Sequence, residues 1–252
     1  MRGDDSMPWT HDYLEVVRAL DLNLAEDRRS TLILDRMLKK QDLKPVEDLI
    51  RNRTVIVYGC GPSLENDLNK IWEAGIHKRS TSVAVDGAAH ALLQYKIVPH
   101  INVTDLDGDL NSIVAANHYG SLTMVHAHAD NIRAIVGLVP KLKGTVYGTT
   151  HSEPTEKVHN FGGFTDGDRA VYIVEHFKPR FIVLAGMDFG HLIGRFSGHY
   201  DAVKKPRGLR MGKYLIEELA GKSRTRILNV TSSGENIKNT KQITVERLRQ
   251  IV

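Results

Sequence analysis

Short apolar runs alternate with helical stretches over most of this chain. Five runs of four or five residues are largely apolar and too short to be helices: residues 55–58, 82–85, 101–104, 122–125 and 181–185. Runs that are apolar on both faces and separated by helices are typical of strands buried in a parallel sheet. The pattern therefore predicts an α/β fold with a Rossmann-like, mostly parallel sheet and helices on both faces.

The N-terminal part of the chain has a different rhythm. From Trp9 to about Ile50, apolar residues recur at helical spacing, as Leu14, Val17 and Leu20 do. Pro45 is expected to separate two helices, because the residue before a proline avoids helical geometry. We therefore expect an N-terminal helical unit over residues 1–50 and an α/β catalytic domain over residues 51–252.

Composition narrows the class of protein. The chain has 252 residues, of which 41% are hydrophobic and 25% charged, as in an ordinary globular protein. A net charge of +4 suits a small anionic ligand, whereas 6% aromatic residues and no basic runs interleaved with aromatics argue against nucleic acid. One cysteine, Cys60, excludes an internal disulfide or a multi-cysteine zinc site. With no signal peptide and no apolar run of membrane-spanning length, a cytoplasmic protein without membrane association is expected.

Glycine and aspartate follow the first two predicted strands. Ligands of open parallel sheets bind beyond the carboxyl ends of the strands, where residues 59–63 and Asp86-Gly87 stand. The glycine turn could bring backbone N–H groups to a phosphate, with Pro62 beginning a helix. A tight turn that needs glycine only for its backbone is the alternative. Leu64 replaces the third glycine of a dinucleotide fingerprint, and no P-loop lysine follows.

The strongest chemical signal is the acidic segment from Asp105 to Asp109. In an extended chain, Asp105 and Asp107 would point the same way, and carboxylates gathered at one spot call for a cation. Magnesium is commonly held by one or two carboxylates and by phosphate oxygens. The alternative is a solvated acidic turn in which Asp109 caps a helix beginning at Leu110.

Three other segments offer candidate ligands. His126, His128 and Asp130 alternate on one face, which is compatible with zinc, with a satisfied histidine pair or with substrate contacts. Residues 162–169 form a glycine-rich loop that opens onto a helix near Asp168, which an ordinary helix cap also explains. The last segment is basic and could neutralise a polyphosphate or form a solvated face: Lys204, Lys205, Arg207 and Lys213.

Ordered motifs in this chain resemble two related enzyme families. The stretches VDGAA at 85–89, IVPH at 97–100 and TDLDG at 104–108, with Thr165-Asp166 later, resemble thiamin pyrophosphokinase. GCGPSL at 59–64, HAHADN at 126–131 and GGFTD at 162–166 are more closely similar to archaeal MptE-like 6-hydroxymethyl-7,8-dihydropterin pyrophosphokinases. The match covers about residues 55–190, with alanine at 129 where glycine is expected and no clear match after Met187.

This resemblance implies magnesium-dependent transfer of diphosphate from ATP to the hydroxymethyl group of a reduced pterin, with release of AMP, in folate- or methanopterin-type cofactor biosynthesis. It implies Asp105, Asp107 and Asp166 as metal ligands, with Asp105, Asp107 and His128 as catalytic candidates. The implied nucleotide contacts are Gly59, Gly61, Pro62, Ser63, Asp86 and Gly87, to which Lys204 and Lys205 are added as phosphate-neutralising candidates. The implied substrate contacts are His126, Asp130, Asn131, Gly163 and Thr165.

Other functions remain open at this point. Thiamin is an alternative acceptor. A Rossmann oxidoreductase or methyltransferase would use Asp86 to bind a ribose, but it would leave the Asp105 cluster without a task. A non-catalytic nucleotide-binding module uses the same glycine turn. The residues also do not identify the general base or decide whether the chain forms a homodimer.

Overall fold

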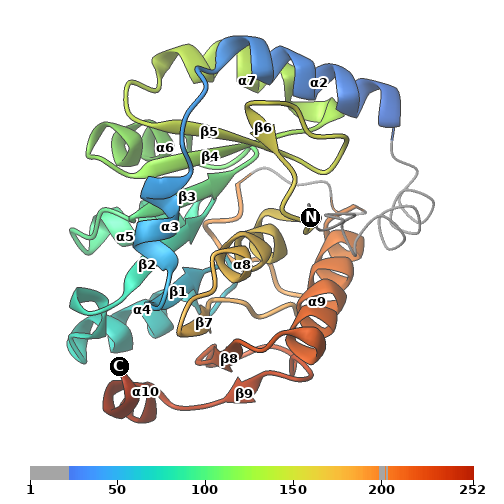
Figure 1. The fold of residues 1–252 in the computed structure, drawn as a ribbon. Helices are drawn as coiled ribbons and strands as arrows, with labels where there is room; N and C mark the ends of the chain where they lie inside the picture. The colour runs from blue at the N-terminus through green and yellow to red at the C-terminus, as the bar shows by residue number, and fades with distance from the viewer. Residues whose placement is uncertain (1–22, 199–201, 203) are drawn as a thin grey trace, which may run out of the picture.

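The computed structural model describes residues 23–198, 202 and 204–252, and its described strands form one parallel sheet (Figure 1). The strands are β1 Thr54–Tyr58, β2 Thr81–Val85, β3 Ile101–Thr104, β4 Leu122–Ala127, β5 Val146–Thr150, β6 Val158–His159, β7 Phe181–Ala185, β8 Arg226–Asn229 and β9 Lys241–Gln242. Their order is β6-β5-β4-β3-β2-β1-β7-β8-β9, and every pairing is parallel. The predicted α/β class with a parallel sheet is confirmed.

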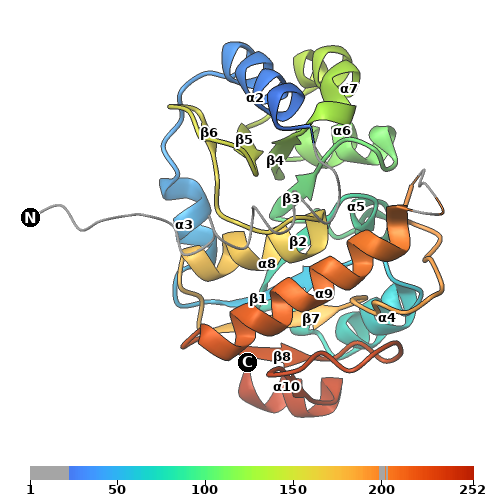
Figure 2. The same ribbon diagram turned by 90° about the vertical axis from the view of Figure 1, so that its right-hand side faces the viewer.

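Helices cover both faces of this sheet (Figures 1 and 2). Their bounds are α2 Leu24–Met37, α3 Lys44–Ile50, α4 Leu64–Glu73, α5 Ala88–Gln94, α6 Leu110–His118, α7 Ile132–Leu138, α8 Asp166–His176, α9 Lys204–Lys222 and α10 Val245–Ile251. Side chains alternate along each strand, so Val55 and Val57 pack with α3, α8 and α9, while Ile56 and Tyr58 pack with α4, α5 and α10. The sheet is buried on both faces, as its apolar runs predicted.

The first described helix, α2, closes the β4–β6 end of the sheet. Leu34 of α2 and Leu38, the residue just after the helix, share a buried core with Val125 of β4 and Ile135 of α7. Pro45 stands in the first turn of α3, so it does begin a second helix. The predicted helical positions Leu14, Val17 and Leu20 lie outside the described residues. The division of the chain at residue 50 stays a prediction.

The position of β1 determines where the loops meet. After β1 the chain moves outward through β2 to β6 and then returns to pair β7 with the other side of β1. The carboxyl ends of β1, β2, β3 and β4 lie next to one another, so the loops that follow them form one continuous edge. In the described ranges, no helix is both long and apolar enough to cross a membrane.

Candidate active site

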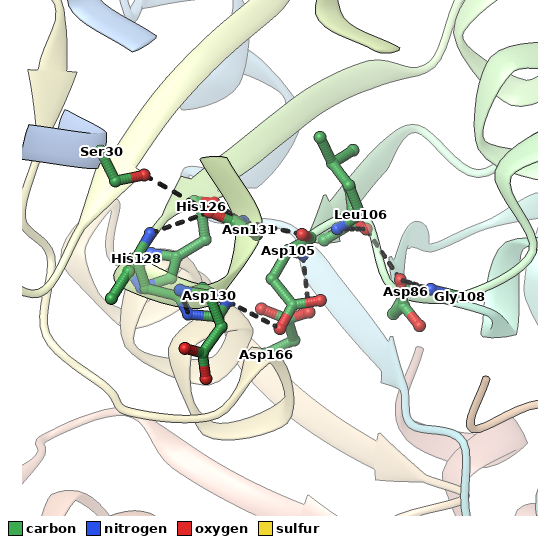
Figure 3. Close-up of polar contacts among 12 residues, drawn as sticks. Ser30, Asp86, Asp105, Leu106, Gly108, His126, His128, Asp130, Asn131 and Asp166 are labelled. Carbon is green, nitrogen blue, oxygen red and sulfur yellow. Dashed lines mark hydrogen bonds and ion pairs between the residues drawn. The ribbon is translucent and has the colours of Figure 1, made fainter. Parts of the chain in front are cut away.

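Three carboxylates converge beyond the ends of β2 and β3. Oxygens of Asp86, Asp105 and Asp107 all lie within 4.8 Å of one another. Asp86 is held by the hydroxyl of Thr104, which donates to its Oδ1 at 2.7 Å, and by the N–H of Gly108 at 3.2 Å. The acidic residues after two neighbouring strands therefore form one cluster, in which Asp86 is buried. Figure 3 shows two of its members, Asp86 and Asp105.

The backbone that makes this cluster is a turn rather than the extended chain expected. Leu106 adopts a left-handed conformation with φ of 70°, its side chain is buried, and its N–H donates to Thr104 Oγ1 at 2.9 Å. The side chain of Leu106 is buried in the same core as Leu34, Val125 and Ile135. The free energy gained by this burial offsets the strain of a positive φ at a residue with a branched side chain. Asp105 and Asp107 come together as predicted, but because of this turn and not because alternate residues share a face.

The cluster is electrostatically poised for a cation. Burial and the charge of Asp105 raise the pKa of Asp86 to about 6. Burial and the charges of Asp105 and Asp86 raise the pKa of Asp107 to about 10. Burial also acts to raise the pKa of Asp105, but the hydrogen bond and charge of His128, a hydrogen bond with Asp107 and the charge of Arg169 together lower that pKa to about 2. Three carboxylates that resist joint ionisation are the arrangement that a divalent cation relieves.

Asp166 lies beside the cluster and is committed to protein partners. Its Oδ2 accepts the N–H of Asp105 at 2.9 Å, and its Oδ1 is paired with the buried guanidinium of Arg169. Burial and the charge of Asp105 raise the pKa of Asp166, whereas Arg169 acts to lower it. Asp166 therefore fixes the backbone of Asp105, and its predicted role as a metal ligand stays a prediction.

Asn131 joins the segment of residues 126–131, called the histidine loop below, to the acidic cluster. Its amide nitrogen donates to the carbonyl oxygens of Asp105 at 2.7 Å and His126 at 2.6 Å, while its amide oxygen accepts the N–H of His128 at 3.1 Å and the hydroxyl of Ser30 at 3.4 Å (Figure 3). As a result the imidazole Nε2 of His128 lies 3.4 Å from Asp105 Oδ2. The buried Asn131 thus holds His128 against Asp105, two of the catalytic candidates.

Beneath His128 lies a buried chain of polar groups that sequence reasoning missed. The Nε2 of His126 lies 3.0 Å from His151 Nδ1, and His151 Nε2 lies 2.9 Å from Asp27 Oδ2. Burial lowers the pKa of His126 well below its ordinary value, and burial likewise lowers that of His151 against the opposing effect of Asp27. Asp27 also accepts the N–H of Ala129 at 2.8 Å, so α2 holds the loop that carries His128.

The glycine turn after β1 is packed tightly against the loop after β7. The N–H of Gly61 donates to the carbonyl of Gly186 at 2.8 Å, and a Cβ at Gly61 would lie 1.9 Å from Asp188 Oδ2. Ser63 is buried, and its hydroxyl lies within hydrogen-bond distance of Asp188 and Asp67, at 2.8 and 2.9 Å. Close packing alone therefore requires glycine here. Helix α4 begins at Leu64, two residues after the predicted start at Pro62.

A segment after β7 covers the neighbouring loops. A Cβ at Gly87 would lie 2.0 Å from the carbonyl oxygen of Phe196, and a Cβ at Gly198 would lie 2.6 Å from that of Asp107. The hydroxyl of Ser197 donates to the carbonyl of Cys60 at 3.2 Å. The segment around Phe196 thus borders the glycine turn, Asp86-Gly87 and the acidic cluster, in the part of the chain where no motif was identified.

Loop 162–166 ends in a helix cap. Thr165 is the N-cap of α8, which begins at Asp166 rather than near Asp168 as expected. The buried Asp168 accepts N–H groups of Phe164 and Thr165, and Gly163 has φ of 82°, with its backbone packed against Arg169. These contacts explain the glycine and the threonine by local structure and bring Asp166 to the acidic cluster. The predicted substrate roles of Gly163 and Thr165 stay predictions.

Lys204 and Lys205, at the start of α9, lie near different parts of the candidate site. The Nζ of Lys204 is 3.6 Å from Asp130 Oδ2, and both side chains are largely exposed. Burial raises the pKa of the Cys60 thiol, and the charge of Lys205 opposes that shift, which requires Lys205 to lie near the glycine turn. The basic end of α9 therefore reaches both the histidine loop and the turn after β1.

Curated relatives match this chain over most of their length. It is 38% identical over 201 residues to 6-hydroxymethyl-7,8-dihydropterin pyrophosphokinase from Methanocaldococcus jannaschii, covering 77% of this chain and 83% of the relative. Proteins with the same name from Methanothermobacter thermautotrophicus and Pyrococcus furiosus are 36% and 37% identical. Those two alignments each cover 87% of this chain, and 97% and 96% of the respective relatives.

A solved structure shares the fold alone. The MAf glycosyltransferase from Magnetospirillum magneticum AMB-1 superposes with a TM-score of 0.52 at 15% identity, over 85% of this chain. The match spans 39% of the glycosyltransferase chain. At this identity the likeness supports the α/β architecture and carries no information on activity.

The family model "6-hydroxymethylpterin diphosphokinase MptE-like" matches residues 32–194, which contain the acidic cluster, the glycine turn and the histidine loop. Together with the archaeal relatives, this match confirms the resemblance seen in the motifs, and the chain belongs to the MptE-like 6-hydroxymethylpterin diphosphokinase family.

Proposed function

We propose that this protein transfers diphosphate from ATP to the hydroxymethyl group of 6-hydroxymethyl-7,8-dihydropterin, with magnesium, and releases AMP. The observation that carries the proposal is the convergence of Asp86, Asp105 and Asp107 at the carboxyl edge of the sheet. Family membership supplies the acceptor, since each curated relative described above is named for a pyrophosphokinase acting on this pterin.

The cluster fits a magnesium ion by its donor chemistry. All three side chains offer carboxylate oxygens, the ligands that magnesium prefers. Asp105 Oδ1 is buried and has no hydrogen-bond partner among the described residues, which is costly unless a cation or water lies against it. When bound, the metal would neutralise charge on the triphosphate. Asp86, Asp105 and Asp107 are the proposed ligands, and Asp166 supports Asp105 from behind.

In the proposed reaction, the hydroxymethyl oxygen of the pterin attacks the β-phosphorus of ATP. A new bond forms between that oxygen and the β-phosphorus, the bond from the β-phosphorus to the α–β bridging oxygen breaks, and AMP leaves with the electron pair. The hydroxyl proton must be accepted, and His128 is the candidate because its imidazole is partly exposed and lies beside Asp105. Such a transfer depends mainly on in-line positioning and charge neutralisation.

The remaining predicted site residues fall into two groups: those that a ligand can reach from the solvent, and those that are buried and hold the loops in place. Lys205 lies near the glycine turn, and Lys204 and Asp130 form an exposed ion pair that a ligand could reach from the solvent side. His126 and Asn131 are buried and bonded to protein atoms, so we assign them to holding the loop rather than to touching the pterin. Gly59, Gly61, Pro62 and Ser63 remain candidates for nucleotide contact through the backbone.

The dinucleotide alternative has less support. A ribose-binding aspartate at the end of a second strand must be accessible to the sugar. Asp86 instead accepts bonds from Thr104 and Gly108 and is buried in the acidic cluster. Its surroundings suit a metal-binding group better than a ribose contact.

The proposed activity is tested by incubating the protein with ATP, magnesium and 6-hydroxymethyl-7,8-dihydropterin and following the products by phosphorus NMR. We expect AMP and a pterin diphosphate in equal amounts, and neither product when EDTA replaces magnesium. Formation of ADP, or no turnover, would refute the proposal. A parallel incubation with thiamin distinguishes the acceptors, because AMP formed only with thiamin would transfer the proposal to that substrate.

A further inference from the structure

A cavity opens at the opposite edge of the sheet from the acidic cluster. Its volume is about 640 Å³, which is within the range of small-molecule sites. It is lined by the first residues of β1 and β2, Thr54 and Thr81, and by residues that directly precede β3 and β7, His100 and Arg180. Strands of five residues separate the two edges by about 16 Å, so the cavity is distinct from the candidate active site.

The walls of this cavity are strongly basic. Arg53, Lys78, Arg79 and Arg180 line it, and its lining includes no aspartate or glutamate. Arg53, Lys78 and Arg180 are exposed and form no ion pair with any carboxylate in the described ranges. The guanidinium of Arg79 donates to a main-chain oxygen of Val252 at 3.0 Å, and that of Arg180 lies over the ring of Phe181, 5.2 Å from its centroid. Arg53, Lys78 and Arg180 therefore line the cavity without an ion pair to an aspartate or glutamate side chain of the described residues.

The sheet register forces two of these cations together. Thr54 pairs with Phe181, so Arg53 and Arg180, the residues just before them, lie side by side. The N–H of Arg180 donates to the carbonyl of Arg53 at 2.8 Å, which fixes the two backbones to one another. Neighbouring like charges repel, and an anion bound between them would remove that repulsion.

Helix dipoles do not account for this concentration of charge. Cations stabilise the C-terminal turn of a helix, but the effect falls off within that turn. Arg53 lies beyond the end of α3 at Ile50, and Arg180 lies beyond the end of α8 at His176. Guanidinium and ammonium groups that have no carboxylate partner are suited to binding phosphate oxygens.

We propose that the cavity at the amino edge of the sheet is a second binding site, for a small molecule that carries a diphosphate or several phosphate groups. Arg53 and Arg180 bind the phosphate oxygens from one side, and Lys78 neutralises charge from the other. The site is built from the amino ends of β1 and β2, so it is available whether or not the acidic cluster is filled.

Calorimetric titration with inorganic pyrophosphate in EDTA tests this site on the whole chain. Without magnesium the acidic cluster repels the probe, so binding reports on basic sites. We expect one-to-one binding that weakens about tenfold in Arg180→Ala and about tenfold in Lys78→Ala, the cost of removing one charged hydrogen-bond partner. Both side chains are exposed, so both variants should fold. Lys39→Ala removes an exposed lysine outside the cavity and should bind as the original does.

Lys205→Ala separates this cavity from the candidate active site. Because Lys205 lies near the glycine turn at the other edge, the proposal requires its loss to leave pyrophosphate binding in EDTA unchanged. Absence of binding, or equal affinity in Arg180→Ala, Lys78→Ala and the original chain, would overturn the proposal. So would a loss of binding in Lys205→Ala, because the probe would then occupy the active site.

Discussion

The imidazole Nε2 of His151 lies 2.9 Å from Oδ2 of Asp27, and this buried contact joins α2 to the loop after β5. Through Ala129 and His126, the same pair supports the loop that carries His128. The stability of α2 and the placement of a catalytic candidate therefore depend on one carboxylate.

Asp27→Asn should destabilise the protein by about 1–3 kcal/mol at pH 7, the cost of weakening a buried, charge-assisted hydrogen bond. Burial acts to raise the pKa of Asp27, but His151 lowers it below its ordinary value overall. The stabilisation from the ionised group is therefore complete above the unfolded-state pKa of about 3.9 and is lost as pH falls through the folded-state pKa. Urea denaturation should show a difference at pH 7 that shrinks below about pH 4.

The control for that variant is Glu26→Gln, which changes an exposed acid on the same helix. Its ion pair with Arg29 is exposed and should contribute little. Equal loss of stability in the two variants would show that the buried contact with His151 stabilises the protein no more than the exposed ion pair does.

Asp107→Asn should abolish magnesium-dependent turnover while leaving the fold intact. The neutral side chain loses a proposed metal ligand, and part of it reaches solvent, so little packing changes. Burial and neighbouring carboxylates raise the pKa of Asp107 to about 10, so its ionisation opposes folding as pH rises. Without metal, the variant should be at least as stable as the original chain at pH 8, as measured by thermal denaturation in EDTA.

Asp109→Asn is the matched control for the acidic segment. Asp109 caps α6 by accepting the N–H of Asn111 at 3.2 Å, as predicted for it, and asparagine caps helices equally well. Turnover in Asp109→Asn should stay near that of the original chain. If both variants lost activity alike, the assignment of Asp107 as a metal ligand and of Asp109 as only a helix cap would be wrong.

Asn131→Asp should lower kcat at least about tenfold and destabilise the protein by about 1–3 kcal/mol. The change keeps the shape but removes the N–H groups that bind the carbonyls of Asp105 and His126, and it sets a carboxylate against them. Asn111→Asp, in the exposed first turn of α6, is the control and should be neutral or slightly stabilising. Unchanged kcat in Asn131→Asp would show that the loops do not need this tie.

Gly61→Ala should disrupt the turn after β1. The added Cβ would lie 1.9 Å from Asp188 Oδ2 and 2.6 Å from the carbonyl oxygen of Gly186, and backbone cannot yield by that much. We expect loss of soluble protein or a clear fall in melting temperature. Gly137→Ala, in α7 with open space around the new methyl, should instead raise stability by about 0.5–1 kcal/mol. A Gly61→Ala protein as stable as the original would contradict the close packing seen here.

The central strands could be predicted from their continuous apolar runs. Strands that are polar or very short were not predicted. The strand β5, Val146–Thr150, contains a glycine and two threonines, and β8 begins with Arg226. The strands β6 and β9 have two residues each. Pairing with the completed sheet determines such strands, and local pattern carries little information about it.

Some features of the candidate site could likewise be predicted from the sequence, whereas others depend on tertiary packing. The rule that ligand-binding loops follow the carboxyl ends of strands brought Asp86, Asp105 and His128 to one edge. The left-handed turn at Leu106 depends on core packing, and the pairing of Asp27 with His151 joins residues far apart in the sequence. Asp86 was expected to bind nucleotide because the sequence could not show that its oxygens meet those of Asp105 and Asp107.

Because β1 pairs with β7, the middle of the finished sheet is an edge for much of the chain's synthesis. Ser63 and Asp188, which close the turn after β1, are 125 residues apart. At ordinary rates of translation, Asp188 emerges roughly 6 to 25 s after Ser63. During that interval one side of β1 has no strand to pair with, and an unpaired apolar edge is prone to aggregation. The edge of β1 that β7 covers in the finished sheet is therefore exposed to association with other chains until the seventh strand has been made.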